Sequence, residues 1–232
     1  MKKLFLILVV SITFLISGKL NAQRLQVGFD IGFSKVVNDN YYSINPNDHK
    51  GFGLGLDNLY NISTNLKYGL NFLPVNIAFN LSYVGGSSVN TYWGTLNIYD
   101  SHFTKIILES SIDIISIGLG LEYPLHYKDY TPYISVGFLT NYFADLDATQ
   151  NPKPDDLFSL IPYHFENSFK LGAYLGVGLD YKISNQYSIG LSLKYGFMNL
   201  TGKKDFLPFI KESDMNILNF AANFLFNLNY LK

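Results

Sequence analysis

Two long runs of alternating residues, joined by a short polar break, stand out in the second half of the chain. The run from Phe169 to Tyr181 places mostly apolar side chains at odd positions, with glycine, lysine, tyrosine and aspartate between them. The run from Tyr187 to Phe197 repeats this pattern. Because successive side chains of a strand point to opposite faces, the period of two predicts an antiparallel hairpin with its turn at 182–186.

Both predicted strands are longer than the ~5–6 residues of an average soluble strand. Their second face carries glycine, serine and charged residues, which do not pack as a core. This combination is typical of a wall with hydrocarbon on one side and a narrow polar lumen on the other. We therefore expect an all-β fold: an eight-stranded antiparallel up-and-down transmembrane β-barrel.

Similar alternation predicts the other strands. A first strand begins at Leu25, a fourth ends at Pro124, a fifth begins at Pro132 and the last contains Leu218. In the fourth strand the phase breaks at Asp113, which predicts a bulge or an emergence from the bilayer at that point.

The second and third strands are harder to bound. The second is expected from Phe52 to about Asn61, followed by a short turn at 63–65. The third begins either at Leu66, with an irregularity at Pro74, or at Val75 after a longer connection. The first of these readings is preferred.

The predicted connections alternate between long and short. The long ones are expected at 38–50, 85–105, 144–167 and 198–214. Within the second of these, residues 92–98 could alternatively extend a strand above the membrane. Outer-membrane barrels have short periplasmic turns and longer extracellular loops, with both termini in the periplasm. The tyrosines expected in an interfacial girdle are Tyr123, Tyr181, Tyr187 and Tyr230.

The N-terminus has the pattern of a secretory signal peptide. Lys2 and Lys3 precede an apolar run, and Leu-Asn-Ala precedes the expected cleavage between Ala22 and Gln23. Residues 1–22 are thus the expected signal peptide and 23–232 the expected outer-membrane barrel domain. The apolar run is short for a membrane-spanning anchor, which is the alternative interpretation. Outer-membrane localisation of the exported chain follows from this interpretation.

The amino-acid composition narrows the classes of protein to which the chain could belong. Charged residues make up 15% of the chain, below the ~25% of soluble domains. Cleavage would remove three lysines and no acid, changing the formal net charge from −1 to −4, and this gives no electrostatic basis for nucleic-acid binding. The chain has no cysteine, which excludes disulfides, thiolate metal sites and a lipidated N-terminal cysteine.

The polar faces predict a set of charged side chains inside the barrel. An eight-stranded barrel has an interior just wide enough for side chains to fill. We expect these charges to pair and close the lumen; the alternative is a narrow ion or solute path that they line. The set is Asp30, Asp57, Glu122, Lys170, Asp180 and Lys194.

Catalytic and metal-binding patterns are weak. The four histidines, at 49, 102, 126 and 164, are far apart and lack metal-ligand spacing. Glycine clusters such as Gly176 and Gly178 lack the spacing of nucleotide-binding loops, and the sequence contains no GxSxG elbow. We therefore expect no enzymatic activity, no metal and no cofactor.

Three segments carry a family resemblance: Leu-Glu-Tyr-Pro-Leu at 121–125, Thr-Pro-Tyr-Ile at 131–134 with Gly137, and Gly-Val-Gly-Leu-Asp-Tyr at 176–181. In these the chain resembles the outer-membrane β-barrel domain family, porin-family and OmpX/OmpA-like, of Bacteroidetes-type Gram-negative bacteria. The likeness covers nearly the whole mature chain. It implies an eight-stranded barrel without catalytic residues.

Several functions are compatible with this fold. The first is a structural or surface-interaction barrel embedded in outer-membrane lipid, which meets ligands or protein partners through its loops. The second is a narrow small-solute or ion channel, and the third is an accessory barrel of a secretion or assembly machine. A soluble periplasmic lipid-binding barrel, with its apolar faces inward, is the competing class. The loop candidates are Tyr41, Tyr42, Tyr92, Trp93, Phe158 and Tyr163.

Overall fold

The computed structural model describes residues 25–37, 56, 58–70, 73–94, 104–125, 129–151, 167–202, 205–207, 210–211 and 214–228. Several sequence-based expectations fall outside these residues: the signal peptide with its Ala22/Gln23 cleavage, and the four histidines. The same holds for Asp57, Tyr230, Tyr41, Tyr42, Phe158 and Tyr163. Within the described part of the chain, no helix is long and apolar enough to cross a membrane.

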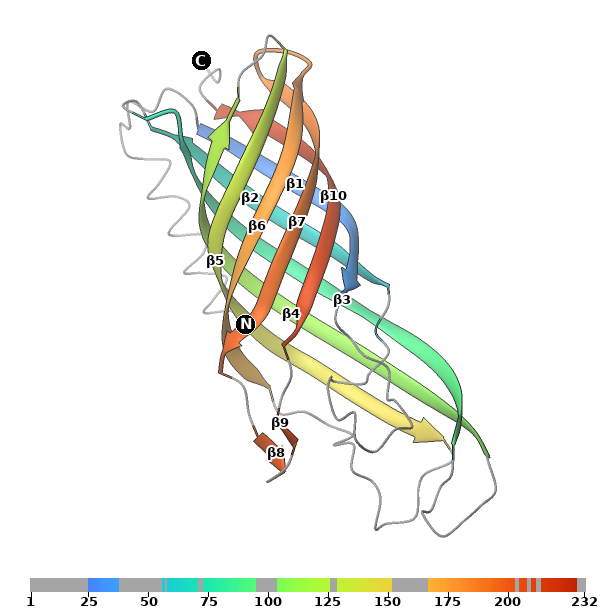
Figure 1. The fold of residues 1–232 in the computed structure, drawn as a ribbon. Helices are drawn as coiled ribbons and strands as arrows, with labels where there is room; N and C mark the ends of the chain where they lie inside the picture. The colour runs from blue at the N-terminus through green and yellow to red at the C-terminus, as the bar shows by residue number, and fades with distance from the viewer. Residues whose placement is uncertain are drawn as a thin grey trace, which may run out of the picture.

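Eight antiparallel strands form a closed barrel in the order β1-β10-β7-β6-β5-β4-β3-β2 (Figure 1). Its strands are β1 (Leu25–Val36), β2 (Leu59–Gly69), β3 (Asn76–Gly94), β4 (Thr104–Pro124), β5 (Tyr130–Asn151), β6 (Ser168–Lys182), β7 (Tyr187–Thr201) and β10 (Asn216–Asn227). Sequence neighbours pair with each other, and β1 pairs with β10 to close the ring. A small separate hairpin, β8 (Asp205–Leu207) with β9 (Ile210–Lys211), precedes the last strand.

The two ends of the barrel differ. One end, called here the turn end, carries short turns such as 70–75 and 183–186, together with the start of β1 and the end of β10. Backbone hydrogen bonds close it, including Leu70 N to Val75 O at 3.0 Å and Asn227 N to Gln186 O at 2.8 Å. The opposite end is called the loop end.

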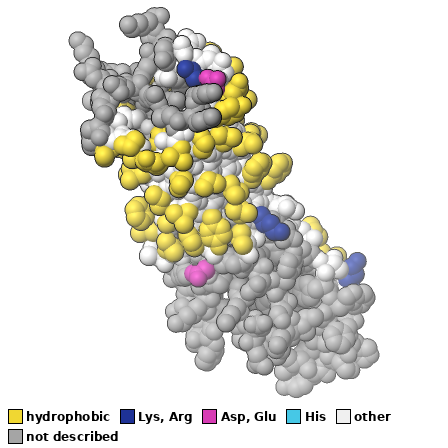
Figure 2. Space-filling model, turned by 45° about the horizontal axis from the view of Figure 1, so that its top comes forward, with side chains coloured by type: hydrophobic (Ala, Val, Ile, Leu, Met, Phe, Trp, Pro, Cys, Tyr) yellow, Lys and Arg dark blue, Asp and Glu magenta, His cyan; other side chains and the backbone are white. Residues whose placement is uncertain are grey.

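The alternation of the sequence becomes an apolar outer wall and a polar interior. Phe33, Phe138 and Phe169 point outward with 76%, 78% and 71% of their surface exposed. Asp30 and Lys67 point inward and are buried. Figure 2 shows the outward apolar side chains as a band across the middle of the face in view, with described charged groups above and below it.

The predicted bounds of the second and third strands are wrong. The expected turn at 63–65 lies in the middle of β2, which begins at Leu59 and continues past the expected end near Asn61 to Gly69, whereas the expected start at Phe52 lies outside the described residues. Pro74 lies in the turn between β2 and β3 rather than within a strand, and β3 begins at Asn76, close to the alternative start at Val75. Proline has no N–H for a sheet ladder, which explains its place in the turn.

Three strands continue beyond the rim of the barrel at the loop end (Figure 1). The last β2–β3 pair is Tyr60 with Gly85, yet β3 continues to Gly94 and pairs there with β4. β5 continues alongside β4 to Asn151. The predicted long connections at 85–105 and 144–167 were therefore too long. Tyr92 and Trp93, which are among the loop candidates, belong to β3, as the alternative of a strand extension at this point predicts.

Candidate functional site

The interior near the turn end is crossed by a buried ion-pair cluster centred on Lys67. Its Nζ lies 2.9 Å from Glu122 Oε2 on β4 and 3.2 Å from Asp180 Oδ2 on β6. Strands β2 and β6 are four places apart in either direction around the eight-membered ring, so Lys67 joins opposite walls. Asn76 Nδ2 also donates to Glu122, and Lys67 Nζ lies 4.4 Å from the centre of the Tyr133 ring. A cation so surrounded links four strands across the lumen.

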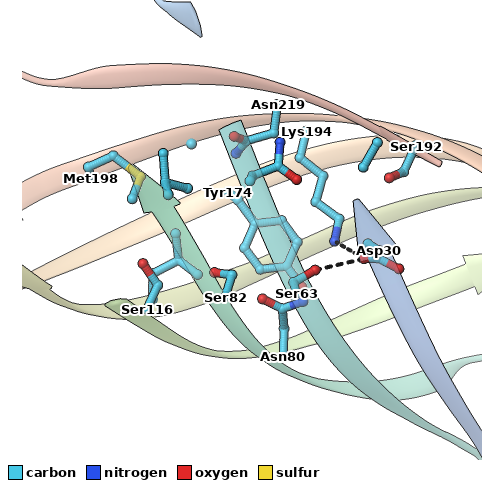
Figure 3. Close-up of a pocket in the computed structure, with 15 residues that line it drawn as sticks. Asp30, Ser63, Asn80, Ser82, Ser116, Tyr174, Ser192, Lys194, Met198 and Asn219 are labelled. Carbon is cyan, nitrogen blue, oxygen red and sulfur yellow. Dashed lines mark hydrogen bonds and ion pairs between the residues drawn. The ribbon is translucent and has the colours of Figure 1, made fainter. Parts of the chain in front are cut away.

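A second polar network lies further along the lumen around Asp30. Its Oδ2 accepts a hydrogen bond from Ser63 Oγ at 2.9 Å, and its Oδ1 accepts one from Asn65 Nδ2 at 2.8 Å. Lys194 Nζ reaches from β7 to 3.9 Å from Asp30 Oδ2, which is too long for a direct hydrogen bond. Figure 3 shows Lys194 and Ser63 converging on this carboxylate.

A third cross-lumen link is neutral. Asn223 Nδ2 on β10 donates to the Tyr133 hydroxyl on β5 at 3.1 Å, while its Oδ1 accepts from Ser192 Oγ. Tyr133 thus contacts Lys67 through its ring and Asn223 through its hydroxyl, so it connects the Lys67 cluster to this third link. Side chains from four strands, β2, β5, β7 and β10, meet in the lumen at this level.

A cavity of about 50 Å³ lies next to the Asp30 network (Figure 3). Its lining includes Asn80, Ser116 and Lys194. A larger and more accessible recess of about 260 Å³ lies at the turn end, beyond Glu122 and Asp180. The Lys67 cluster, which includes both of these carboxylates, therefore forms the inner wall of the recess.

The loop end of the interior is filled by apolar side chains, a feature that the sequence analysis did not anticipate. Ile112, Ile114 and Ile217 are completely buried there. The loop-end apolar cluster consists of Val36, Leu56, Leu59, Val84, Ile112, Ile114, Leu139, Phe143, Tyr174, Met198, Met215 and Ile217. This cluster places hydrocarbon in the interior at this end, in contrast to the polar networks near the turn end.

The predicted lumen charges can be placed individually. Asp30, Glu122, Lys170 and Asp180 are buried inside the barrel, and Lys194 is inside but less completely covered. Lys170 lies with its Nζ 4.8 Å from the centre of the Phe143 ring.

Lys67, the centre of the strongest network, was missed because the turn expected at 63–65 interrupted its strand. The alternation of Tyr60, Ile62, Thr64, Leu66 and Tyr68 was the signal that could have revealed it. This alternation assigns Lys67 to the polar face.

The outer wall carries tyrosines near the turn end. Tyr123, Tyr181 and Tyr187 are 46%, 41% and 40% exposed. Tyr181 packs against Tyr130, with ring centres 5.0 Å apart, and Tyr187 packs against Phe226 at 5.3 Å. The aromatic side chains therefore form neighbouring pairs along this edge of the apolar wall.

Asp113 lies on the outer wall nearer the loop end. The Tyr83 hydroxyl donates to its Oδ1 at 2.5 Å, and the Tyr60 hydroxyl lies 3.2 Å from that of Tyr83. The irregularity expected at Asp113 is present, because the register shifts between Asp113 and Ile114, while the pairing of β4 with β3 stays continuous. The register shift is in the pairing with β5, where Ala144 is the additional residue. What changes at Asp113 is the polarity of the two faces: Ile112 and Ile114 point inward and Asp113 outward.

Among the described residues, no group of three or more His, Cys, Asp or Glu side chains could hold a metal ion. The interior charges are engaged with each other and with amide, hydroxyl and aromatic groups. Such an arrangement can brace the wall and exclude solutes.

No family model matches the sequence, and no curated protein matches it. Among solved structures, Neisserial surface protein A is similar at 12% identity with a TM-score of 0.54, covering 88% of this chain and 97% of that chain. The N-terminal barrel domain of OprF from Pseudomonas aeruginosa has 13% identity and a TM-score of 0.40, with 87% and 97% covered. OprG, an outer membrane protein from the same organism, has 12% identity and a TM-score of 0.41, with 87% and 95% covered. The closed strand order and the first similarity confirm the expected fold: this chain is an all-β, eight-stranded antiparallel barrel.

Proposed function

We propose that this protein is an integral outer-membrane β-barrel that anchors extracellular segments and does not conduct solutes. The observation that carries the proposal is the outward apolar wall around a polar interior. Burying one large apolar side chain is worth about 1.5–3 kcal/mol, so a wall with phenylalanines more than 70% exposed is suited to lipid and not to water.

The height of the apolar wall fits a bilayer. On β4 its limits are Tyr123 near the turn end and Asp113 near the loop end, ten residues apart. At about 3.3 Å per residue these span about 33 Å along the strand, and a tilt of about 40° reduces this to about 25 Å. The apolar band of outer-membrane barrels is about 25 Å tall. The polarity change at Asp113 then marks the outer boundary of the membrane.

The interior supports an anchor more than a channel. The Lys67 cluster crosses the lumen near the turn end, and the loop-end apolar cluster fills it at the other end. An ion would have to separate buried ion pairs and then pass through packed hydrocarbon. Both barriers act in series, so opening one does not open a path.

A soluble lipid-binding barrel needs the opposite arrangement, with apolar side chains facing inward and polar side chains facing outward. Its apolar side chains would surround an internal cavity large enough for an acyl chain, and ligand sites usually occupy about 300–1,000 Å³. The cavity in the middle of this barrel is about 50 Å³ and has Asp30 and Lys194 in its wall. This arrangement favours the membrane-embedded alternative.

The external role is proposed for the loop end. There the paired extensions of β3, β4 and β5 project beyond the rim of the barrel. The structural neighbour with the higher similarity is called a surface protein, which is compatible with contacts made outside the cell. A rigid barrel with projecting strands would hold such contacts at a fixed distance from the lipid.

Fractionation and heat-modifiable migration test the membrane assignment. The protein, expressed with its own N-terminus in a Gram-negative host, should be recovered in the outer-membrane fraction. On gels with sodium dodecyl sulfate it should migrate differently with and without boiling, as a folded barrel does. Recovery in the soluble periplasmic fraction, without a heat-dependent shift, would contradict the proposal.

Planar-bilayer recording separates the anchor from the channel. The folded protein should produce no steps in current when it is reconstituted at a density at which a known porin conducts. Reproducible single-channel steps from a preparation free of host porins would refute the closed lumen, while leaving the membrane location intact.

A further inference from the structure

The cavity near Asp30 contains polar groups that the protein leaves without partners. Asn80 Nδ2 and Ser116 Oγ are both buried, with 8% and 1% of their residues exposed. Neither atom has a hydrogen-bond partner among the described residues. Both residues line the same cavity of about 50 Å³. A buried donor without a partner costs about 1–3 kcal/mol, so these groups require an acceptor that the chain does not supply.

The pair formed by Lys194 and Asp30 is a second, independent observation. Both side chains line the cavity, and Lys194 Nζ is 3.9 Å from Asp30 Oδ2. This distance is too long for a direct hydrogen bond but allows one molecule to accept from the ammonium and donate to the carboxylate. The two charged groups thus define a bridging position at the edge of the cavity.

Size and charge together select the ligand. A buried water needs about 10–15 Å³ of cavity measured in this way, so 50 Å³ has room for about three or four. Among the described residues of the lining, the charged ones are Asp30 and Lys194, which have opposite signs, so an ion of either sign would be attracted by one and repelled by the other. A larger organic ligand would not fit. Water satisfies both the size and the neutrality of this cavity.

We propose that the cavity is a built hydration site, holding about three or four ordered waters that satisfy Asn80 and Ser116 and bridge Lys194 to Asp30. This inference goes beyond the anchoring function and does not depend on the membrane location. Val84, Leu139 and Met198 belong both to the cavity lining and to the loop-end apolar cluster, so water is confined on that side. On the other side the Asp30 network offers several hydrogen-bonding groups, so we expect these waters to exchange more slowly than surface water.

Magnetic relaxation dispersion of ¹⁷O-labelled water counts such long-lived waters in the folded, detergent-solubilised protein. Ser116→Val removes the hydroxyl and occupies cavity volume, so the dispersion amplitude should fall by about a quarter to a third, corresponding to one displaced water. Ser116→Ala is the matched control: it removes the same hydroxyl without adding volume, so the amplitude should fall less than in Ser116→Val, because the space for the water remains.

Asn80→Leu gives a second variant of similar side-chain size, useful if Ser116→Val does not fold. It removes the donor, and the amplitude should again fall. A crystal structure of the wild type at high resolution should show density at the position between Lys194 Nζ and Asp30 Oδ2. A wild-type amplitude equal to that of a barrel without internal water, or density absent from that position, would overturn the inference. The migration and conductance experiments would be unaffected.

Discussion

Lys67 and Asp180 stand on opposite walls of the barrel, and their Nζ and Oδ2 atoms lie 3.2 Å apart in its interior. The same ammonium is 2.9 Å from Glu122. The Lys67 ammonium thus forms ion pairs with two buried carboxylates. Removing a partner of a buried ion pair is more costly than the pair itself is stabilising, because the remaining charge stays without compensation.

Lys67→Met should therefore lower the free energy of unfolding by about 3–5 kcal/mol, since it leaves Glu122 and Asp180 unpaired in the lumen. Urea titration of the barrel in lipid vesicles, followed by the folded and unfolded bands on unboiled gels, measures this change. Lys182→Met, at an exposed position near the turn end, is the control and should change little. Combining Lys67→Met with Glu122→Gln and Asp180→Asn should restore much of the loss. A single variant as stable as the wild type would contradict the bracing role.

Leu119→Arg tests which solvent the outer wall meets. Leu119 is 59% exposed in the middle of β4. In a bilayer an outward arginine near the midplane should cost about 2–4 kcal/mol. On a water-exposed surface the same change is usually within about 0.5 kcal/mol of neutral. Unfolding in vesicles gives the difference directly.

Val89→Arg is the matched control for that experiment. Val89 is 68% exposed but lies on the part of β3 beyond the rim. It should be close to neutral in the same vesicles. Equal effects at the two positions would mean that the wall between the turn end and Asp113 does not face lipid.

Gly120→Ala tests whether the close contact between strands β4 and β5 at Gly120 requires a residue without a side chain. Gly120 pairs with Gly137, and the Tyr174 side chain lies over both. A methyl group at Gly120 would stand 2.5 Å from the backbone oxygen of Val136, which cannot move without shifting the sheet. Overpacking of this kind should cost about 1–3 kcal/mol in the urea titration.

Gly196→Ala serves as the comparison for Gly120→Ala. The added methyl group would meet the flexible end of Met198 at 3.1 Å and a backbone oxygen at 3.7 Å. The side chain can adjust, so the change should be small. If both glycine variants lose the same stability, the explanation from backbone contact is incorrect.

Tyr83 and Asp113 should be energetically coupled on the outer wall. A hydrogen bond to a charged group is worth about 1.5–3 kcal/mol when buried, and partial exposure reduces it here to about 1 kcal/mol. A double-mutant cycle of Tyr83→Phe and Asp113→Ala measures the coupling. Additive losses would show that the 2.5 Å contact contributes no stability.

Local alternation was sufficient to predict the strands in which one face is consistently apolar and the other is small or polar. The hairpin of β6 and β7 has this character, and its turn at 183–186 was predicted to within one residue. β2 was misassigned because its polar run Asn-Ile-Ser-Thr-Asn resembles a turn in composition. In the barrel Asn61, Ser63 and Asn65 of this run face the lumen, and Asp30 accepts hydrogen bonds from Ser63 and Asn65.

The loop-end apolar cluster could not be predicted from the pattern, because it inverts the rule that defines the rest of the barrel. Along β4 the inward residues change from Ser116 to Ile114 while the outward ones change from Ile115 to Asp113. A single sequence shows this as a break in phase. Only the continuous pairing with β3 shows that the strand is regular and that its surroundings change.

The continuation of β3 beyond the barrel determines how far the protein extends from the rim. The nine residues from Gly86 to Gly94 follow the last pair with β2, and at about 3.3 Å each they carry the strand about 30 Å further. That length is comparable to the thickness of the bilayer's hydrocarbon core. Under the proposed anchoring function, the extensions of β3 and β4 would act as a spacer that sets the distance between the rim of the barrel and contacts made beyond it.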